Sequence, residues 1–160
     1  MISHLGSIAG GRMRVRDIMT TKVFTIGADK KAFVAKEIME WAHVRHIPVV
    51  DSSNRVVGII SHRDILRASL SALNTRFAEA ERRQHLSGAP ALAIMHHPAR
   101  TIEPDASVQE AAGMMRQFKF GCLPVVKDGR LVGIVTEYDI LELVEQLPPD
   151  ALPPGAPAAT

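Results

Sequence analysis

Two stretches of the chain repeat one pattern of apolar and polar positions. Pro48–Leu66 and Pro124–Leu141 each contain an apolar run, a polar turn and a second apolar run with one glycine, followed by a hydroxyl residue, two variable residues, an aspartate and Ile-Leu. Pro48 and Pro124 are 76 residues apart, and three further pairs share this offset: Ile18-Met19 with Ile94-Met95, Thr25-Ile26 with Thr101-Ile102, and Asp29 with Asp105. A constant offset of this kind predicts a tandem duplication.

Each copy is predicted to contain a strand, a helix, two strands and a second helix. Val23–Ile26 is a short β-rich run, and Asp29 is a candidate N-cap for the helix that follows. Apolar residues recur at helical spacing in this helix and in its repeat. They are Ala32, Ala35, Ile38, Met39 and Ala42 in the first copy, and Val108, Ala111, Ala112, Met115 and Phe118 in the second.

A hairpin is predicted after each of these helices. Ile47–Val50 and Val56–Ser61 read as strands joined by the turn Asp51–Arg55, and a helix is expected from near Asp64. In the second copy Asp128-Gly129 predicts a tighter turn, because Asp-Gly between apolar runs favours a two-residue loop. This turn is one residue shorter, which lowers the offset to 75 for Gly58 and Gly133.

These elements predict five segments along the chain of 160 residues. They are a flexible N-terminal arm (1–14), a first repeat (15–67) that opens with a short helical lead-in, a charged helical linker (68–90), a second repeat (91–145) and a disordered, proline-rich tail (146–160). The linker is either a solvated connection or a partner-binding helix. One repeat alone is too small to bury much apolar area, so we expect the two to pack face to face, share a core and form a pseudo-twofold cleft.

Composition narrows the possible functions. Hydrophobic residues make up 46% of the chain and aromatic residues only 4%, so the core is predicted to be aliphatic. The net charge of +2 argues against nucleic acid as the main partner, although arginines at 45, 63, 67, 82 and 83 leave weak RNA or DNA binding open. The single cysteine, Cys122, excludes an intrachain disulfide, and neither a signal peptide nor a membrane span is apparent. We therefore expect a cytoplasmic protein without membrane contact.

The repeated residues resemble a pair of cystathionine β-synthase (CBS) domains, a Bateman module, over Val15–Val144. The resemblance rests on the matched pairs above, on Ile47–Val50 and Leu123–Val126, and above all on the motifs Gly58-Ile59-Ile60-Ser61-His62-Arg63-Asp64 and Gly133-Ile134-Val135-Thr136-Glu137-Tyr138-Asp139. It implies an α/β (α+β) fold of two βαββα repeats around a central cleft, a homodimer and a regulatory role without catalysis. It also implies an adenosyl ligand in the cleft (AMP, ADP or ATP first, NAD or S-adenosylmethionine as alternatives) and signalling to an unidentified effector protein.

The hydroxyl-x-x-aspartate element of each motif is the main candidate for ligand contact. It is predicted where a strand enters a helix, and a helix N-terminus offers unpaired N–H groups to a phosphate. Ser61 and Thr136 could donate to phosphate oxygens, and Asp64 and Asp139 could accept from ribose hydroxyls. The glycine before each element favours ligand contact, since a missing side chain leaves room for close approach. The same spacing also forms a capping box without any ligand, and Ser107 with Glu110 is assigned to capping alone.

The resemblance implies further site residues. Thr25 and Thr101 would lie beside the cleft as polar contacts, unless they serve only as β-favouring residues in strands. Main-chain groups of Arg45-His46-Ile47 and of Gly121-Cys122-Leu123 would face the edge of the adenine.

The two copies differ in the charge around the motif. Arg45, His46, His62 and Arg63 surround the first, whereas Phe120, Gly121, Cys122, Glu137 and Tyr138 occupy the corresponding places in the second. Cationic donors strengthen phosphate binding, so the Ser61–Asp64 site is predicted to prefer a phosphorylated nucleotide. The Thr136–Asp139 site is predicted to bind more weakly, or to take a less anionic adenosyl group. The alternative is that these side chains face solvent and that a phosphate at the second site uses a cation from elsewhere.

We predict neither a metal site nor a catalytic site. The histidine pairs His43 with His46 and His96 with His97 do not form a closed ligand set with cysteine or carboxylates at the usual spacing. Cys122 has no evident catalytic partner and is expected to be a small buried residue beside the cleft. The main alternative to a ligand sensor is a structural dimerisation module with empty sites.

Overall fold

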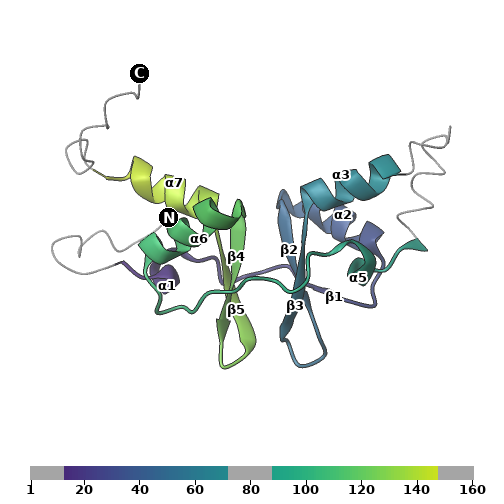
Figure 1. The fold of residues 1–160 in the computed structure, drawn as a ribbon, viewed down its shortest axis with the longest axis horizontal. Helices are drawn as coiled ribbons and strands as arrows, with labels where there is room; N and C mark the ends of the chain where they lie inside the picture. Colours follow the sequence, from purple (N-terminus) through teal and green to yellow (C-terminus); the bar gives the residue numbers. More distant parts are fainter. Residues whose placement is uncertain (1–12, 72–87, 148–160) are drawn as a thin grey trace, which may run out of the picture.

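The computed structural model describes residues 13–71 and 88–147, which form two α/β halves side by side (Figure 1). Nearly all of the predicted N-terminal arm and tail, and most of the predicted linker, lie outside the described residues. No helix within the described ranges is both long and apolar enough to cross a membrane. The elements in chain order are α1 (Val15–Ile18), β1 (Ile26–Gly27), α2 (Ala32–Ala42), β2 (His46–Val50), β3 (Val56–Ser61), α3 (His62–Ser71), α5 (Ala91–Ile94), α6 (Val108–Phe118), β4 (Cys122–Lys127), β5 (Arg130–Thr136) and α7 (Glu137–Glu145).

Each half contains an antiparallel hairpin, β2 with β3 and β4 with β5. In the first half β1 adds a third strand, parallel to β2. In the second half the corresponding strand is reduced to one parallel bridge between Ile102 and Val125. The predicted order of strand, helix, strand, strand and helix is therefore confirmed in the first half and shortened in the second.

The two hairpin turns have the predicted chemistry. The Asp51 carboxylate accepts hydrogen bonds from the backbone N–H groups of Ser53 and Arg55 at 2.8 and 2.9 Å, which closes the longer turn. Asp128 and Gly129 both have positive φ, 50° and 76°, as the two-residue turn requires. The hairpin tips lie side by side (Figure 1), and Leu131 N–H donates to the Asn54 carbonyl at 3.0 Å, which joins the halves at this end.

The long helices α2 and α6 are related by the offset of 76 residues, and each ends in a left-handed residue, His43 and Lys119. The prediction that Asp29 caps the first of them is wrong. Lys31 is the N-cap and makes no side-chain cap bond, because Asp29 lies in the preceding turn and the Ala32 N–H donates instead to the Ala89 carbonyl at 2.8 Å. Ser107 caps α6 as predicted, accepting a hydrogen bond of 3.1 Å from the Glu110 N–H.

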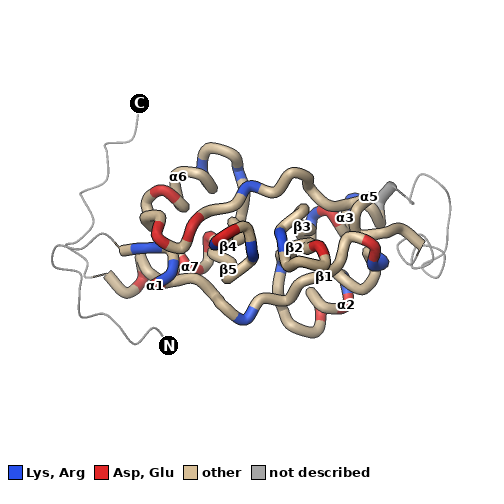
Figure 2. The backbone as a smooth tube through the Cα atoms, turned by 90° about the horizontal axis from the view of Figure 1, so that it is seen from below, with Lys and Arg blue, Asp and Glu red and all other residues tan. Residues whose placement is uncertain are grey.

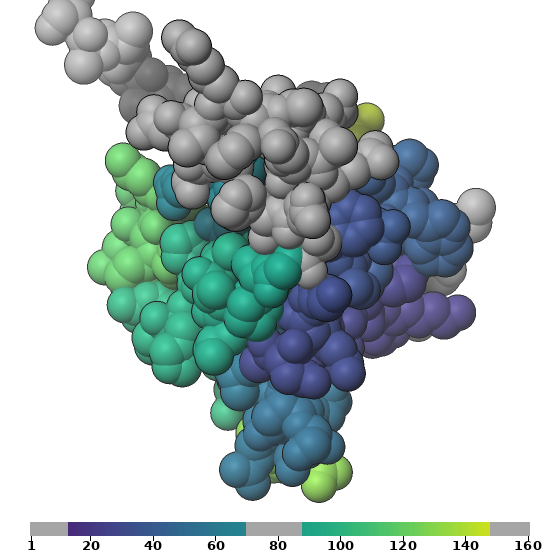
Figure 3. Space-filling model, turned by 90° about the vertical axis from the view of Figure 1, so that its right-hand side faces the viewer, coloured from purple at the N-terminus to yellow at the C-terminus, as the bar shows by residue number. Residues whose placement is uncertain are grey.

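Each half completes its core with the first segment of the other repeat. α1 places Val15 and Ile18 in the buried cluster that contains α6, β4 and β5 side chains. α5 places Ala91 in the cluster of α2, β2 and β3. Figure 1 shows α1 beside α6 and α7, and Figure 3 shows the segment 88–95 lying against α2. We expected one shared core; the structure has two cores, each closed by a segment from the other repeat.

Two connecting segments make this exchange, one following α1 and the other following α5. They run on opposite sides of the central hairpins (Figure 2). One pairs Thr20 with Ile134 of β5 through two backbone hydrogen bonds of 2.9 Å. The other pairs His96 with Ile59 of β3 through bonds of 2.8 and 3.1 Å. The two crossings are therefore copies of one contact.

A glycine lies under each crossing. A Cβ at Gly133 would come within 2.7 Å of Met19 Sδ and 3.1 Å of the Thr20 carbonyl oxygen. A Cβ at Gly58 would overlap the Met95 side chain and come within 3.0 Å of the His96 carbonyl oxygen. The expectation that these glycines make room for a ligand is wrong, since protein atoms of the crossing segment fill that room.

We expect Gly133→Ala to lower the free energy of unfolding by about 1–3 kcal/mol, because the added methyl group must push the Met19 side chain aside and shift the Thr20 carbonyl slightly. Gly113→Ala is the matched control. A Cβ at Gly113, inside α6, would meet nothing within 4 Å, so alanine is expected to stabilise that helix by about 0.5–1 kcal/mol. Urea denaturation of both variants measures the difference, and two equal changes would contradict the role assigned to the crossing.

Candidate functional site

Both hydroxyl-x-x-aspartate elements lie at the junction of a strand and a helix. Ser61 ends β3 directly before α3, and Thr136 ends β5 directly before α7. The two helices start near the middle of the molecule and diverge from there (Figure 1). Their N-terminal N–H groups are thus brought toward the seam between the halves.

Each element forms the hydrogen bonds of a capping box. Ser61 donates to Asp64 Oδ2 from its backbone N–H at 2.8 Å and from its hydroxyl at 2.5 Å, and the Asp64 N–H donates to Ser61 Oγ at 3.3 Å. Thr136 and Asp139 repeat this arrangement with distances of 2.6, 2.7 and 3.4 Å. The capping explanation is therefore correct for both elements, and contact of the same residues with a ligand stays a prediction.

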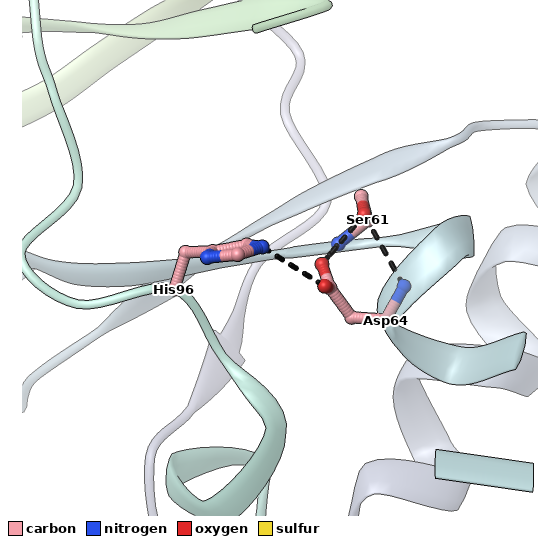
Figure 4. A network of polar contacts seen from close by, with 3 residues as sticks. All are labelled: Ser61, Asp64 and His96. Carbon is pink, nitrogen blue, oxygen red and sulfur yellow. Dashed lines mark hydrogen bonds and ion pairs between the residues drawn. The ribbon is translucent and has the colours of Figure 1, made fainter. Parts of the chain in front are cut away.

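The first element has a further contact. His96 Nε2 lies 3.0 Å from Asp64 Oδ1, opposite the oxygen that bonds Ser61 (Figure 4). Asp64 is only 5% exposed, so its two oxygens are held by these partners with little access to water. The corresponding residue on the other connecting segment is Thr20. Among the described residues, Asp139 has no ion pair with a histidine.

A cavity of about 1030 Å³ opens beside the first element. Both halves form its wall, which places it at the seam. The lining residues are Arg45, His46, Ile59, Ser61, His62, Arg63, Leu66 and Arg67 from the first repeat, His96, Pro98, Ala99 and Arg100 from the second connecting segment, and Met115, Arg116, Lys119, Phe120, Gly121, Cys122, Pro124 and Glu137 from the rest of the second repeat.

Half of the predicted site residues line this cavity: Arg45, His46, Ser61, Arg63, Gly121 and Cys122. Asp64 lies buried behind Ser61, and Ile47 is part of the first core. The cavity wall does not include Thr25, Thr101, Thr136 or Asp139. Arg45-His46 and Gly121-Cys122, which belong to different repeats, meet at the same cavity because they lie where β2 and β4 begin, on either side of the seam.

The cavity wall is strongly cationic. Arg45, Arg63, Arg67, Arg100, Arg116 and Lys119 line it, against one carboxylate, Glu137. Within residues 13–71 and 88–147, none of these six cations forms an ion pair with a carboxylate. A wall of this charge attracts an anion.

Sequence reasoning missed Arg100, Arg116 and Lys119. They lie outside the repeated motif. They belong to the second repeat, whereas the cavity that they line lies beside the Ser61–Asp64 element of the first repeat. The signal that could have found them is the loss of repeat symmetry, since Phe24, Glu40 and His43 stand 76 residues before them. Arg100 is also held in place, because its guanidinium stacks 3.7 Å from the ring of Phe118, which stacks in turn on Phe120.

His46 lies at the seam, close to Gly121 of the other repeat. A Cβ at Gly121 would come within 3.1 Å of His46 Cε1, and the Glu137 carboxylate lies beside the same glycine. Burial lowers the pKa of His46, and this effect exceeds the opposing influence of the Glu137 and Asp64 carboxylates. The imidazole is therefore held in its neutral form, in which it can both donate and accept a hydrogen bond.

Cys122 is buried beside the cavity, as predicted. Burial, with a smaller contribution from the Glu137 carboxylate, raises the pKa of its thiol to about 12. At neutral pH the residue is therefore a thiol and a weak nucleophile. Among the described residues, no three His, Cys, Asp or Glu side chains come together in a group that could hold a metal ion.

The raised pKa of Cys122 predicts slow alkylation. At pH 8 we expect iodoacetamide to modify the folded chain at least about 100-fold more slowly than the chain unfolded in urea, because the thiolate is the reactive form. Mass spectrometry of quenched samples measures the rate without ambiguity, since the chain has one cysteine. Equal rates in the two states would contradict the buried, protonated thiol.

Comparison with known proteins identifies the repeats. A family model described as "CBS domain" matches residues 15–71 and again residues 91–146. A CBS domain-containing protein of Dictyostelium discoideum is 34% identical over 145 residues, which cover 88% of this chain and 99% of the relative. An uncharacterized protein of Methanocaldococcus jannaschii, MJ1404, is 30% identical over 87% of this chain but only 34% of its own length. The chain thus spans nearly all of the first relative and about a third of the second.

Two crystal structures show the same architecture. The CBS domain of a CBS domain-containing membrane protein from Sphaerobacter thermophilus is 34% identical, with a TM-score of 0.67 over 82% of this chain and 88% of the other. The CBS domain pair of protein MJ0100, in complex with 5′-methylthioadenosine and S-adenosyl-L-methionine, is 28% identical, with a TM-score of 0.70 over 84% and 98%. The predicted α/β fold of two pseudo-twofold repeats around a central cleft is confirmed. The two halves are CBS domains in tandem, and the chain belongs to the CBS domain family.

Proposed function

We propose that the cavity beside Ser61 binds an adenosyl ligand, with an adenine nucleotide as the first candidate, and that the module reports its occupancy to a partner protein. The observation that carries the proposal is the composition of the wall, where both halves, the start of α3 and six cationic side chains meet. A ligand bound there contacts both repeats at once. Its binding can therefore change how the repeats sit together, which is the property a sensor needs.

Two features of the wall suit a phosphate. The dipole of α3, which starts at His62, favours an anion at this end of the helix. Two of the first N–H groups are already used, since the His62 N–H donates to the Arg45 carbonyl at 2.8 Å and the Asp64 N–H belongs to the capping box. Ser61 lines the wall directly before the helix, but its hydroxyl donates to Asp64 Oδ2. Arg63 lies in the first turn, and a guanidinium binds phosphate through paired, charge-assisted hydrogen bonds.

The role of Asp64 toward a ribose is narrower than the sequence implied. Its Oδ2 accepts both hydrogen bonds from Ser61, so a ribose hydroxyl has access only to Oδ1, where His96 already lies at 3.0 Å. Arg45-His46 and Gly121-Cys122 line the cavity, and their main-chain groups remain our candidates for the adenine edge. The ligands of the MJ0100 structure, 5′-methylthioadenosine and S-adenosyl-L-methionine, support an adenosyl group as the part that is recognised.

A structural dimerisation module is the second candidate, and one surface favours it. Tyr138, Leu141 and Val144 follow one another at a spacing of three residues along α7 and are 72%, 63% and 39% exposed. A second copy of the chain could cover this apolar face without any ligand. Weak nucleic-acid binding is the third candidate, and it is disfavoured because the six cations surround a cavity rather than a flat face.

A thermal-shift measurement with AMP, ATP, NAD and S-adenosylmethionine tests the first proposal. We expect AMP or ATP at 100 times its dissociation constant to raise the melting temperature by roughly 5–10 °C, because a ligand that binds only the folded state stabilises it. If none of the four ligands shifts the melting temperature at saturating concentration, the dimerisation module is favoured instead.

Asp64→Ala and Asp139→Ala form a matched pair for this test. Both remove the same capping bonds, worth about 0.5–2 kcal/mol, but only Asp64 lies behind the cavity. We expect the shift caused by AMP to be lost in Asp64→Ala and kept in Asp139→Ala. The reverse result would place the nucleotide in the second half, against the proposal.

A further inference from the structure

We propose that this cavity selects a ligand with several phosphates, that it holds one such ligand per chain, and that Arg100, Arg116 and Lys119 of the second repeat set this selectivity. The proposal rests on the proposed function for the adenosyl part of the ligand. It adds the charge of the ligand and the number of ligands bound per chain. Both follow from a difference between the two sides of the pseudo-twofold axis.

The cations of the wall have no cationic counterparts in the other half. The offset of 76 residues is fixed here by structure, since His43 and Lys119 are the left-handed C-caps of equivalent helices. It relates Arg45 to Gly121, Arg100 to Phe24, Arg116 to Glu40 and Lys119 to His43. After the hairpins the offset is 75, which relates Arg63 to Tyr138 and Arg67 to Glu142. On the related side, each of these six positions therefore holds a neutral residue, a histidine or a glutamate.

The balance of charge on the related side is reversed. Two cations, Lys22 and Arg45, stand at positions related to the wall residues Pro98 and Gly121. Three carboxylates, Glu40, Glu137 and Glu142, stand at positions related to Arg116, His62 and Arg67. A polyphosphate is attracted by the first wall and repelled by the second, which gives one such ligand per chain.

The number of phosphates follows from the Coulomb energy of the wall. Six cations around one cavity repel one another, and within the described residues they have no ion-paired carboxylate to reduce that repulsion. The attraction of an anion grows with the product of the charges. Each further phosphate thus gains affinity from cations that one phosphate leaves unpaired.

Position also separates the second-repeat cations from the helix that holds the first phosphate. Arg63 and Arg67 lie on α3 itself, whereas Arg116 and Lys119 lie at the C-terminal end of α6 and Arg100 on the connecting segment. Arg100 is held against Phe118, so its charge stays at the wall. These three side chains are therefore the ones we assign to phosphates beyond the first.

Isothermal titration calorimetry with AMP, ADP, ATP and inorganic tripolyphosphate, in EDTA at fixed ionic strength, tests the proposal. We expect affinity to rise from AMP to ATP by at least about tenfold, with one ATP bound per chain, and we expect tripolyphosphate to compete with ATP. Raising the salt concentration should weaken ATP more than AMP, because screening acts on the larger charge product.

The double variant Arg116→Gln with Lys119→Gln removes two wall cations, and Lys22→Gln with Lys127→Gln is its matched control. Lys127 lies at the exposed end of β4, so the control has the same net charge and leaves the cavity wall intact. We expect the first variant to weaken ATP at least about tenfold and AMP less than about threefold, and the control to change neither. Circular dichroism melts without ligand check that both variants fold, which we expect because all four side chains are exposed.

The outcomes separate this proposal from the proposed function. AMP that binds as tightly as ATP, two ATP molecules per chain, or equal effects of the two double variants would overturn the charge selection and leave adenosyl binding in place. Binding of tripolyphosphate without binding of any nucleotide would overturn the adenosyl ligand and leave the charge selection in place. Binding of none of the four probes would overturn both.

Discussion

At each crossing the backbone of one repeat lies directly on a glycine of the other repeat's hairpin. The two contacts, Thr20 on β5 and His96 on β3, are copies of one another and carry paired backbone hydrogen bonds. They deliver α1 and α5 to the opposite cores, where Val15 and Ala91 are fully buried. Neither core is complete without this exchange, so the stability of each repeat depends on the presence of the other. The small size of a single repeat, which leaves little area to bury, is thereby overcome.

The same exchange builds the cavity. The connecting segment that crosses β3 carries His96, Pro98, Ala99 and Arg100 along the start of α3, and so adds second-repeat residues to the wall beside Ser61. Gly121 and His46 approach each other across the seam beside the cavity, and the bond of Leu131 to Asn54 joins the halves at the hairpin tips. A cavity bounded by both repeats is therefore a consequence of how they fold, and its charge is free to differ between the two sides. The backbone is duplicated closely, whereas the side chains on the two sides of the seam are not.

Local chemistry was enough to predict most of the backbone. The prolines, the Asp-Gly turn and the helical spacing of apolar residues predict both hairpins and both long helices, and Ser107 caps α6 as expected. Non-local contacts were not predictable in this way. Asp29 has the chemistry of an N-cap, but the helix starts at Ala32, where the Ala89 carbonyl from the distant connecting segment accepts the Ala32 N–H. The glycines were assigned to ligand approach for the same reason, since nothing in the sequence near Gly58 indicates that Met95 will lie on it.

The site was predictable to the extent that it follows the repeated motif. Ser61, Arg63 and Arg45 were found because they lie within or just before that motif, while Arg116 and Lys119 were missed because a helix of the other repeat supplies them. A motif also cannot show which oxygen of a carboxylate is already in use. The hydroxyl-x-x-aspartate spacing was consistent with a cap and with a ligand contact, and the structure shows that the cap uses one oxygen of Asp64 and leaves the other facing His96.

That second oxygen connects the cavity to the constraint on which the fold depends. His96 is the residue whose backbone forms the crossing on Ile59, and its side chain is the partner of Asp64 Oδ1. A ribose hydroxyl that donates to Oδ1 must share that oxygen with the imidazole or displace it. Either change acts on the segment that closes the first core, one residue from Met95, which packs against that core over Gly58. If the proposed ligand binds in this way, occupancy of the cavity and the fit of the two repeats are linked through one carboxylate oxygen. The related crossing, with Thr20 in place of His96, lacks an imidazole to make this link.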